Sequence, residues 1–315
     1  MVTIYSWILK LTVGLMVVCG VGAMAARSVS LPTRELTFVG YSITQPGVYF
    51  MDVTRGLLTR YIKHPVIGRQ SNFTWSPDQS MIAFRAVFNI TIDLYAVDIN
   101  GENRVRLTEN GKNNHSPAWS PDGRWIAYTS EQDNNAEIYI LDASCVWEKV
   151  SCNGHSSRVT EHPAVDDVAA WSPDSQWLAF QSKRDGDYEI YVVDVSCVAH
   201  EGGCEDSIVR LTEQIGRDIL PAWSPDGQMI AFTSERDGNA ELYTMSLESG
   251  SVRRLTDSPE HEFSPLWSPD GEQLLFQRTV AGSDLETFVM DMESGAIRRL
   301  TTVDMFLQNP SWRPS

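Results

Sequence analysis

The sequence predicts an all-β fold, a six-bladed β-propeller whose blades are four-stranded antiparallel sheets. Three observations support this prediction. A tryptophan-centred motif recurs at nearly constant spacing, short β-type segments recur between its copies, and the two ends of the chain together supply one more set of strands. A period of about 45 residues is typical of propeller blades with four strands each.

The recurring motif is Trp-Ser-Pro-Asp, which occurs five times and is followed by a degenerate sixth copy, Trp-Arg-Pro-Ser, at the end of the chain. The six tryptophans are Trp75, Trp119, Trp171, Trp223, Trp267 and Trp312. Successive tryptophans are 44, 52, 52, 44 and 45 residues apart. Because adjacent blades of a propeller pack through repeated core positions, we expect these indoles to lie between blades.

Four strands, called A to D in chain order, are expected in each repeat. In the repeat around Trp119, strand A is expected at Pro117–Trp119, strand B at Trp125–Ser130 and strand C at Glu137–Asp142. Strand D is expected in the Arg-Leu-Thr segments, which end at Thr108, Thr212, Thr256 and Thr301, with Arg158-Val159-Thr160 as a variant. Aromatic and β-branched residues in short runs between turn signals favour strands over helices. The Pro and Gly of Ser-Pro-Asp-Gly suit a tight turn between strands A and B.

The two chain ends predict how the ring closes. Residues 36–41, 47–52 and 56–61 are expected to form strands B, C and D of a blade that has no strand A of its own. Residues 309–312 are expected to supply that strand. One C-terminal strand joining three N-terminal strands would remove the open sheet edges.

These repeats resemble the TolB-like propeller family. The resemblance rests on Pro-x-Trp-Ser-Pro-Asp-Gly, as in residues 221–227, on the Asp-Gly tip at residues 237–238, and on the Glu-Ile-Tyr and Arg-Leu-Thr segments. It covers about 280 residues. It implies the fold but not an activity, because prolyl-oligopeptidase-like peptidases use the same blade type. We expect no counterpart here of the additional α/β domain of TolB or of a peptidase domain.

Charge and hydropathy exclude several classes of function. The chain has 41 acidic and 25 basic residues in 315, a formal net charge of −16. Such a surface repels phosphate backbones and anionic lipids, so we expect no nucleic-acid partner. Only the N-terminus is apolar enough to enter a membrane, which excludes a multi-span transporter.

The N-terminal segment predicts export. Residues 11–26 carry no charge but are fewer than the roughly 20 residues of a spanning helix. Ala23-Met24-Ala25 suits cleavage by a signal peptidase before Ala26. An uncleaved anchor that includes residues 5–9 is an alternative, and a lipid-modified Cys19 is another, although Val18 does not fit a lipoprotein signal.

Domain organisation follows from this segment. We expect residues 1–25 to be a signal peptide or membrane anchor, residues 26–34 a linker and residues 35–315 the propeller. All three alternatives for the N-terminal segment place the propeller in the periplasm, at the cell surface or in the medium. The chain would contact the membrane only through this segment, if it is not cleaved.

Four cysteines lie outside the N-terminal segment, as two pairs with six intervening residues each: Cys145 and Cys152, and Cys197 and Cys204. Each pair occupies the same place in its repeat, within the extra residues of the two longer spacings. We expect local disulfides, which persist in oxidising compartments. Zinc binding is the alternative, but structural zinc sites use shorter ligand spacings.

Strand alternation assigns the loops to two faces. The A–B turns and the C–D loops, which hold both cysteine pairs, share one face, and the B–C tips and D–A loops share the other. The B–C tips include Asp133, Asp185 and Asp237, which we interpret as hairpin-turn residues.

One set of positions on the second face is a candidate binding site. The residues five positions before each motif tryptophan are Gln70, Asn114, Asp166, Asp218, Glu262 and Leu307. If strand A lines the central channel, they form a ring at its mouth with carboxylates on three consecutive blades. Such a ring would attract a basic peptide segment or bind Ca²⁺. The alternative is that these acids are simply solvated. His115, His162 and His261 near this face are dispersed and make no metal-ligand spacing.

No catalytic motif is evident, since the sequence contains neither Gly-x-Ser-x-Gly nor His-Glu-x-x-His. The sequence therefore favours a non-catalytic exported scaffold that binds a protein or peptide of the cell envelope at the acidic channel face. A subunit of an extracellular assembly, in which residues 309–315 complete a neighbouring copy, is an alternative. A metal-dependent hydrolase using Asp166, Asp218 and Glu262 is another.

Overall fold

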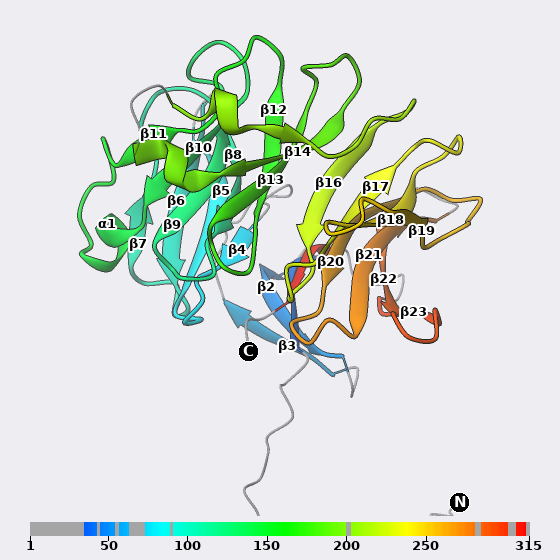
Figure 1. Ribbon diagram of the computed structural model, residues 1–315. Helices are drawn as coiled ribbons and strands as arrows, with labels where there is room; N and C mark the ends of the chain where they lie inside the picture. Colours follow the sequence, from blue (N-terminus) through cyan, green and yellow to red (C-terminus); the bar gives the residue numbers. More distant parts are fainter. Residues whose placement is uncertain are drawn as a thin grey trace, which may run out of the picture. The chain divides into compact units, whose positions relative to one another are not determined.

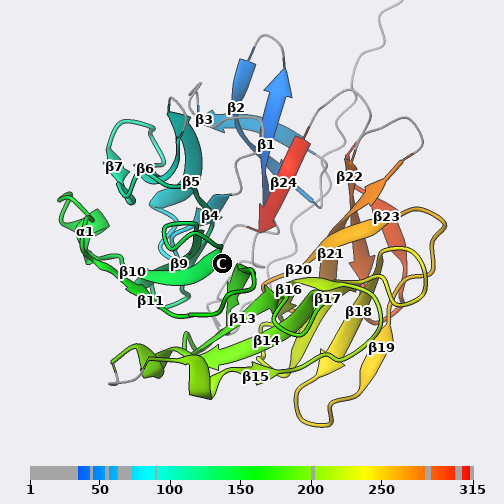
Figure 2. The ribbon, with the colours of Figure 1, turned by 90° about the horizontal axis from the view of Figure 1, so that it is seen from above.

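Six four-stranded antiparallel sheets form a ring in the computed structural model of the chain, as Figures 1 and 2 show. The structure describes residues 35–42, 45–53, 57–62, 73–88, 91–199, 203–280, 285–301 and 307–312. The predicted signal or anchor and linker (residues 1–34) lie outside the described residues. The predicted fold class and number of blades are confirmed. Among the described residues, no helix has the length and apolar character needed to cross a membrane.

The blades follow one another along the chain, and the strands of each blade are given below in the order A to D. Blade 1 contains β24 (Leu307–Trp312), β1 (Glu35–Ser42), β2 (Gln45–Asp52) and β3 (Leu57–Ile62). Blade 2 contains β4 (Phe73–Trp75), β5 (Met81–Phe88), β6 (Thr91–Asp98) and β7 (Arg104–Arg106). Blade 3 contains β8 (Asn114–Trp119), β9 (Trp125–Ser130), β10 (Glu137–Asp142) and β11 (Ser156–Arg158).

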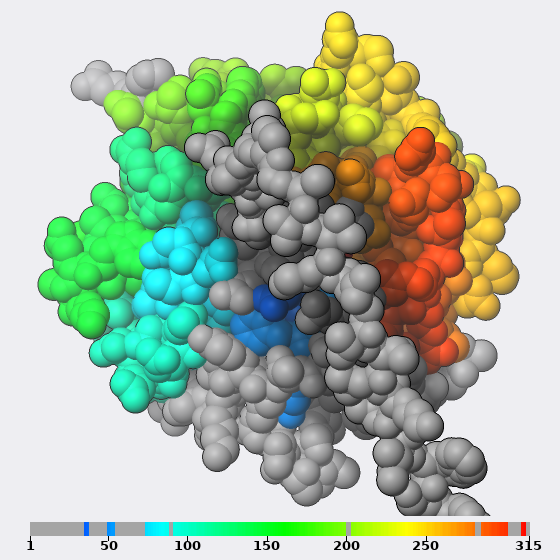
Figure 3. Space-filling view, turned by 90° about the horizontal axis from the view of Figure 1, so that it is seen from below, coloured from blue at the N-terminus to red at the C-terminus, as the bar shows by residue number. Residues whose placement is uncertain are grey.

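The remaining three blades have the same strand order. Blade 4 contains β12 (Asp166–Trp171), β13 (Trp177–Ser182), β14 (Glu189–Asp194) and β15 (Val209–Arg210). Blade 5 contains β16 (Asp218–Trp223), β17 (Met229–Ser234), β18 (Glu241–Ser246) and β19 (Val252–Arg254). Blade 6 contains β20 (Glu262–Trp267), β21 (Gln273–Thr279), β22 (Leu285–Asp291) and β23 (Ile297–Arg299). The colours follow this order around the ring in Figure 3.

The core lies between neighbouring blades, which bury both faces of each sheet. The apolar cluster that includes Ile140 of blade 3 and Trp171 of blade 4 is an example. Four of the six motif indoles also join blades by hydrogen bonds. Nε1 of Trp171 donates to the carbonyl of Ala118 at 3.0 Å, and Nε1 of Trp223 donates to the carbonyl of Ala170 at 3.2 Å. The prediction that the tryptophans lie between blades is confirmed.

The Ser-Pro-Asp segments form the predicted turns between strands A and B. In blade 3, Oγ of Ser120 donates to Asp122 at 2.6 Å and accepts the N–H of Trp125 at 2.9 Å. Gly123 has a positive φ of 75°, which glycine adopts without a steric penalty. The same serine–aspartate hydrogen bond recurs in the turns of blades 2, 4, 5 and 6. Asp122 and its equivalents are therefore turn-forming residues, as expected.

In blades 3 to 6, strand A is longer than the sequence predicts and contains a bulge. In blade 4 it begins at Asp166, and its register with strand B shifts between Asp167 and Ala170. Val168 lies inside the bulge with a positive φ of 53°, which is strained for a β-branched residue. A side chain of the preceding blade supports it, since the N–H of Val168 donates to Oγ1 of Thr129 at 3.3 Å. Ser116, Leu220 and Ser264 have positive φ at the equivalent positions.

Strand D ends earlier than predicted. In blades 2 to 6 its last residue is the arginine of the Arg-x-Thr segment, and the threonine follows the strand. Oγ1 of Thr160, for example, accepts the N–H of Ile138 on strand C at 2.9 Å. The threonine side chain therefore replaces a backbone acceptor at the point where the ladder ends.

The ring closes as predicted. β24 pairs with β1 of the same chain, with Trp312 opposite Leu36. The buried indole of Trp312 belongs to a cluster with Leu36 and Leu275, and its Nε1 donates to the carbonyl of Leu266 in blade 6 at 3.2 Å. The terminal strand thus completes the first blade of its own chain.

Both predicted disulfides are present, and each lies in the C–D connection of its blade. In blade 3, Cys145–Cys152 joins the short helix α1 (Ser144–Trp147) to the residues that follow it. Cys197–Cys204 in blade 4 lies beside the 3₁₀ turns η1 (Val195–Ala199) and η2 (Glu205–Ser207).

We predict that Trp312→Ala strongly destabilises the ring, because it removes a buried indole that joins the first and last blades. The expected loss is about 3–5 kcal/mol of the free energy of unfolding, typical of a buried Trp→Ala change. Urea unfolding followed by circular dichroism measures it. Trp147→Ala, at an indole that is 42% exposed, is the control and should cost clearly less. Equal losses would contradict the closing role of Trp312.

Candidate functional site

The predicted ring residues occupy equivalent places in the structure. Asn114, Asp166, Asp218 and Glu262 are the first residues of strand A in blades 3, 4, 5 and 6, and all four are completely buried. Gln70 lies outside the described residues, and Leu307 opens β24 without a described side chain. The structure therefore gives four members of the ring one common position, but their side chains do not reach the solvent.

Each carboxylate of the ring is paired with an arginine of its own blade, which lies just after strand B in blades 4 and 5 and within strand B in blade 6. Arg184 contacts Asp166 at 2.8 Å, and Arg236 contacts Asp218 at 2.7 Å. In blade 6, Arg278 contacts Glu262 at 2.5 Å. The three carboxylates are thus neutralised within the blades, and the ring by itself does not present a bare negative charge.

The arginines are held in place by aromatic rings. The guanidinium of Arg184 lies 5.0 Å from the ring centroid of Tyr191, and that of Arg236 lies 4.8 Å from the centroid of Tyr243. Arg278 lies 4.5 Å from the centroid of Phe288. Such cation–π contacts add to the fixed orientation of the ion pairs.

Burial has the largest effect on the pKa values of the three ring carboxylates. It raises the pKa of Asp166, Asp218 and Glu262 above the ordinary values, although the facing arginines act in the opposite direction. Desolvation thus outweighs the charge partner at all three positions.

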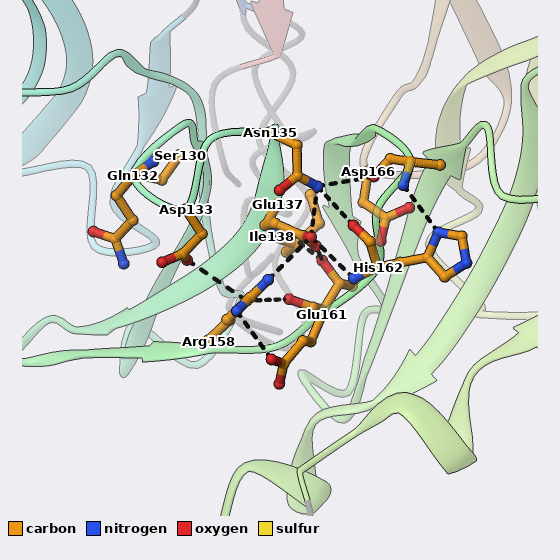
Figure 4. A network of polar contacts seen from close by, with 12 residues as sticks. Ser130, Gln132, Asp133, Asn135, Glu137, Ile138, Arg158, Glu161, His162 and Asp166 are labelled. Atoms are coloured by element: carbon orange, nitrogen blue, oxygen red, sulfur yellow. Dashed lines mark hydrogen bonds and ion pairs between the residues drawn. The ribbon is translucent and has the colours of Figure 1, made fainter.

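A second set of buried carboxylates lies at the start of strand C, beside the ring positions. Figure 4 shows the example of blade 3. Glu137 is completely buried, and its Oε2 accepts the hydroxyl of Thr160 at 2.6 Å. Its Oε1 accepts Arg158 at 3.1 Å and the N–H of His162 at 3.0 Å. The carboxylate therefore joins strand C, strand D and the D–A loop.

Blades 4 and 5 repeat this network. Glu189 accepts Thr212 at 2.5 Å and Arg210 at 2.9 Å. In blade 5, Oε2 of Glu241 accepts the hydroxyl of Thr256 at 2.6 Å, and Arg254 lies 3.4 Å from Oε1.

Blades 2 and 6 contain reduced versions of the network. Asp93 pairs with Arg106 at 2.7 Å, and Glu286 pairs with Arg299 at 2.5 Å. The network is therefore a property of five blades in the described part of the chain.

The network also fixes the exposed B–C tips of blades 3, 4 and 5. Tyrosine hydroxyls of strand C donate to the tip aspartates, from Tyr139 to Asp133, from Tyr191 to Asp185 and from Tyr243 to Asp237. Burial, followed by the hydrogen bond to the aspartate, raises the pKa of each tyrosine. The tyrosines therefore stay protonated and keep donating at neutral pH.

The face that carries these tips keeps a surplus of negative charge. In blades 2 to 5, the strand D arginine lies within ion-pair distance of two or three carboxylates. Arg158 contacts Asp133 at 3.7 Å, Glu137 at 3.1 Å and Glu161 at 3.4 Å. Arg254 likewise faces Asp237, Glu241 and Asp257. One arginine cannot neutralise three carboxylates, so the exposed aspartates and glutamates carry the remaining charge.

The sequence did not identify this network. Asp133, Asp185 and Asp237 are indeed in the hairpin tips, but they are also hydrogen-bonded and ion-paired members of the acidic face. The available signal was the constant spacing of Asp-x-x-x-Glu-x-Tyr followed by Arg-x-Thr, which recurs in these three repeats.

One position distinguishes blade 4 from its neighbours. Nδ2 of Asn135 in blade 3 donates to the carbonyls of His162 and Ala164 at 2.6 and 3.0 Å. Nδ2 of Asn239 in blade 5 makes the equivalent bonds to Ser258 and Glu260 at 2.8 and 3.1 Å. Blade 4 has Asp187 at this position, and a carboxylate cannot donate to a carbonyl. Its D–A loop includes Ile215, which is 93% exposed.

The described candidate metal ligands of the site are not grouped around a common point. No group of three or more histidine, cysteine, aspartate or glutamate residues with a geometry suitable for a metal ion occurs in the part of the chain that the structure describes. The expected Ca²⁺ therefore remains a prediction without a defined ligand set.

Six blades with Ser-Pro-Asp turns, interblade indoles and a shared strand C network define a repeat-built β-propeller scaffold. The sequence model of the family described as the TolB beta propeller domain (PD40) matches residues 22–157 and again residues 158–315. The chain belongs to this TolB β-propeller family.

Individual relatives agree with this assignment. An uncharacterized protein of Agrobacterium fabrum, Atu1656, is 29% identical over 161 residues, which cover 50% of this chain and 52% of the relative. The Tol-Pal system protein TolB of Desulfosudis oleivorans is 31% identical over 115 residues, 36% of this chain and 24% of the relative. The chain thus spans about half or less of these relatives.

A solved structure shows the same fold. The structure of a protein assigned as TolB from Agrobacterium tumefaciens has a TM-score of 0.66 and 21% sequence identity. The similarity covers 90% of this chain and 99% of that one. At this level of identity, the comparison supports the fold alone.

We predict that Asp187→Asn stabilises the protein. The new amide would donate to the D–A loop carbonyls of blade 4, as Asn135 and Asn239 do in blades 3 and 5. The expected gain is about 1 kcal/mol in the free energy of unfolding. Chemical denaturation measures it, and Asn239→Asp is the reciprocal control, which should lose a similar amount. A loss of stability in Asp187→Asn would show that the blades do not share this geometry.

The ring carboxylates predict an unusual pH dependence. Since burial raises the pKa of Asp218 in the folded state, the folded protein binds this proton more tightly than the unfolded chain. This group therefore opposes folding at pH 7, and the opposition disappears as the pH falls through the raised pKa. The change in the free energy of unfolding caused by Asp218→Asn should therefore be most favourable at pH 7. It should become less favourable as the pH falls toward 4.

Asp226 is the control of opposite sign, because its hydrogen bond from Ser224 lowers its pKa. Its stabilising contribution is present above the ordinary aspartate pKa and is lost as the pH falls through the lowered one. Asp226→Asn should therefore cost stability at pH 7 and become neutral in acid. Unfolding curves at several pH values measure both variants, and parallel pH profiles would refute the assignment.

Proposed function

We propose that this propeller is a non-catalytic scaffold of the cell envelope that binds a basic segment of a partner protein on its acidic face. The ring positions Asn114, Asp166, Asp218 and Glu262 are buried beneath this site and support it from within the blades. Asp133, Asp185 and Asp237 form its charged rim. Affinity would come from rigid tips that hold carboxylates at fixed positions.

The observation that supports the proposal most directly is the repeated arrangement of the tips in blades 3 to 5. Each tip aspartate is exposed, yet its position is fixed by a tyrosine and by an arginine that is shared with a buried glutamate. A charge that is already fixed loses little conformational entropy when a lysine or arginine binds. The net charge of −16 adds long-range attraction for a basic partner.

Two further findings support an exported protein that binds proteins. Both disulfides are of the kind that persists in an oxidising compartment. The Desulfosudis relative is named a Tol-Pal system protein, and we extend from it only the class of partner, a protein of the cell envelope.

Capture from an envelope extract tests the proposal. The immobilised protein is compared with a triple variant, Asp133→Asn, Asp185→Asn and Asp237→Asn, at low and high salt. The amides keep an acceptor for the tyrosine hydroxyls but remove three charges. We expect a partner that the parent retains at low salt and releases at high salt, and that the triple variant retains at least about tenfold less.

A matched control removes three exposed carboxylates from the opposite face, with Glu102→Gln, Glu148→Gln and Glu293→Gln in the C–D connections. This control should capture the partner as well as the parent does. Equal losses in both triple variants would indicate a general charge effect and would contradict a site at the tips. Retention that does not respond to salt would contradict electrostatic recognition.

A further inference from the structure

A groove lies between blades 4 and 5 on the face of the A–B turns, opposite the acidic tips. Its volume is about 500 Å³, within the usual range of ligand sites. Blade 4 contributes the turn at Pro173 and Asp174, together with Trp177 and Val192. Blade 5 contributes Trp223, the turn at Asp226 and Gly227, and Leu247. The green residues of blade 4 and the yellow-green residues of blade 5 adjoin in Figure 3.

The corresponding positions between blades 2 and 3 and between blades 3 and 4 are covered by C–D connections. Between blades 2 and 3, the disulfide-closed C–D connection of blade 3 covers Trp119, whose ring centroid lies 5.4 Å from that of Trp147. Between blades 3 and 4, the connection of blade 4 shares one apolar cluster with Trp125 and Trp171. The cysteine insertions are therefore lids over the preceding interblade grooves.

Blade 5 has no such insertion, because its C–D connection is a short turn after Ser246. The next groove, between blades 5 and 6, also lacks an insertion but is filled by Met229 and Met292 in the cluster of Trp267. Between blades 4 and 5, the larger Trp177 stands where blade 5 has Met229, and the space above remains open.

The exposure of the motif tryptophans identifies the same groove independently. Five of the six are at most 8% exposed, namely Trp75, Trp119, Trp171, Trp267 and Trp312. Trp223 alone is partly exposed among these six described residues. The groove thus contains the one indole of these six that is not fully buried.

The groove combines apolar walls with negative charge at its rim. Trp177, Trp223 and Leu247 provide apolar and aromatic surface, and the exposed Asp174 and Asp226 stand at the edge. No lysine or arginine belongs to the residues that line it. The indole faces can hold an aliphatic side chain or the stem of a cation, and the carboxylates attract its charged end.

We propose that the groove between blades 4 and 5 binds a short extended segment of a partner protein in which an apolar side chain stands next to lysine or arginine. The apolar side chain lies against Trp177 and Trp223, and the basic side chain pairs with Asp174 and Asp226. This site is separate from the acidic tips, since it lies on the other face and depends on apolar contact as well as charge.

Fluorescence anisotropy with three labelled hexapeptides tests the proposal on the whole protein. The probes are Gly-Leu-Arg-Leu-Lys-Gly, Gly-Leu-Glu-Leu-Glu-Gly and Gly-Ser-Arg-Ser-Lys-Gly. We expect the first to bind at least about tenfold more tightly than either of the others. Equal binding of the basic peptide without leucine would overturn the proposal in favour of simple charge attraction. Equal binding of the acidic peptide would overturn the role of the aspartates.

Paired variants locate the binding. Trp177→Gln introduces the residue that blade 6 has at this position, Gln273, and should weaken binding of the first peptide about tenfold. Trp125→Gln, at the equivalent position under the lid of blade 4, is the matched control and should leave the affinity unchanged. If both variants or neither weaken the binding, the peptide does not occupy this groove.

A second pair of changes keeps the test decisive if Trp177→Gln does not fold. Asp174→Asn with Asp226→Asn keeps the acceptors of the two turns and removes the rim charge, so binding should weaken and lose much of its salt dependence. The tip triple variant described above should bind the peptide as the parent does. A loss in the tip variant alone would assign the peptide to the acidic face and refute the groove.

Discussion

Contact between neighbouring blades through the motif indoles is the interaction on which the rest of the structure depends. A four-stranded blade cannot bury both of its faces alone, so each sheet is stable only against its neighbours. The indoles fill this space, and four of the six also donate across it, as Trp171 does to Ala118. Because the last indole, Trp312, makes the same contact with blade 6, the ring is one cooperative unit without an open end.

This dependence explains where the repeats are allowed to differ. The strands and the Ser-Pro-Asp turns repeat because both sides of every blade are constrained by packing. The C–D connections lie at the outer edge of the interblade space, so they can be short or extended by a disulfide. Where the connection is short, methionines can fill the groove, as between blades 5 and 6. Variation between blades is therefore concentrated at positions that open or cover a groove, and this is where a repeat protein gains individual binding properties.

Much of the fold could be predicted from the sequence, because the period and the turn residues depend on local chemistry. The spacing of the tryptophans gave the number of blades, and the unmatched strands at the two ends gave the closure. The bulge in strand A could not be predicted, since Val168 and Leu220 are residues that local propensity places at negative φ. Their conformation is imposed by the preceding blade, through Thr129 and Gln181.

For the candidate site, the repeat spacing gave Asp166, Asp218 and Glu262 one equivalent position but not its chemistry. The sequence prediction put these residues in the loops before strand A, whereas the structure makes them the first residues of that strand. Their burial depends on where the side chains turn after the bulge, and their neutralisation depends on Arg184, Arg236 and Arg278, which lie 16 to 18 residues away in sequence. Such pairings are set by strand register and cannot be deduced from the repeat spacing alone.

Burying so many carboxylates does not by itself make the protein stable. The desolvation of an ion pair often cancels its attraction, and apolar residues of similar size would stabilise the blades at least as well. What the buried glutamates add is direction, because a carboxylate such as Glu137 has fixed partners on strand C, strand D and the D–A loop. An apolar side chain would leave the strand D arginine without its buried partner and so weaken one of the two contacts that hold each tip aspartate. The network therefore makes the best sense as a device that trades some stability for a defined arrangement of exposed charge.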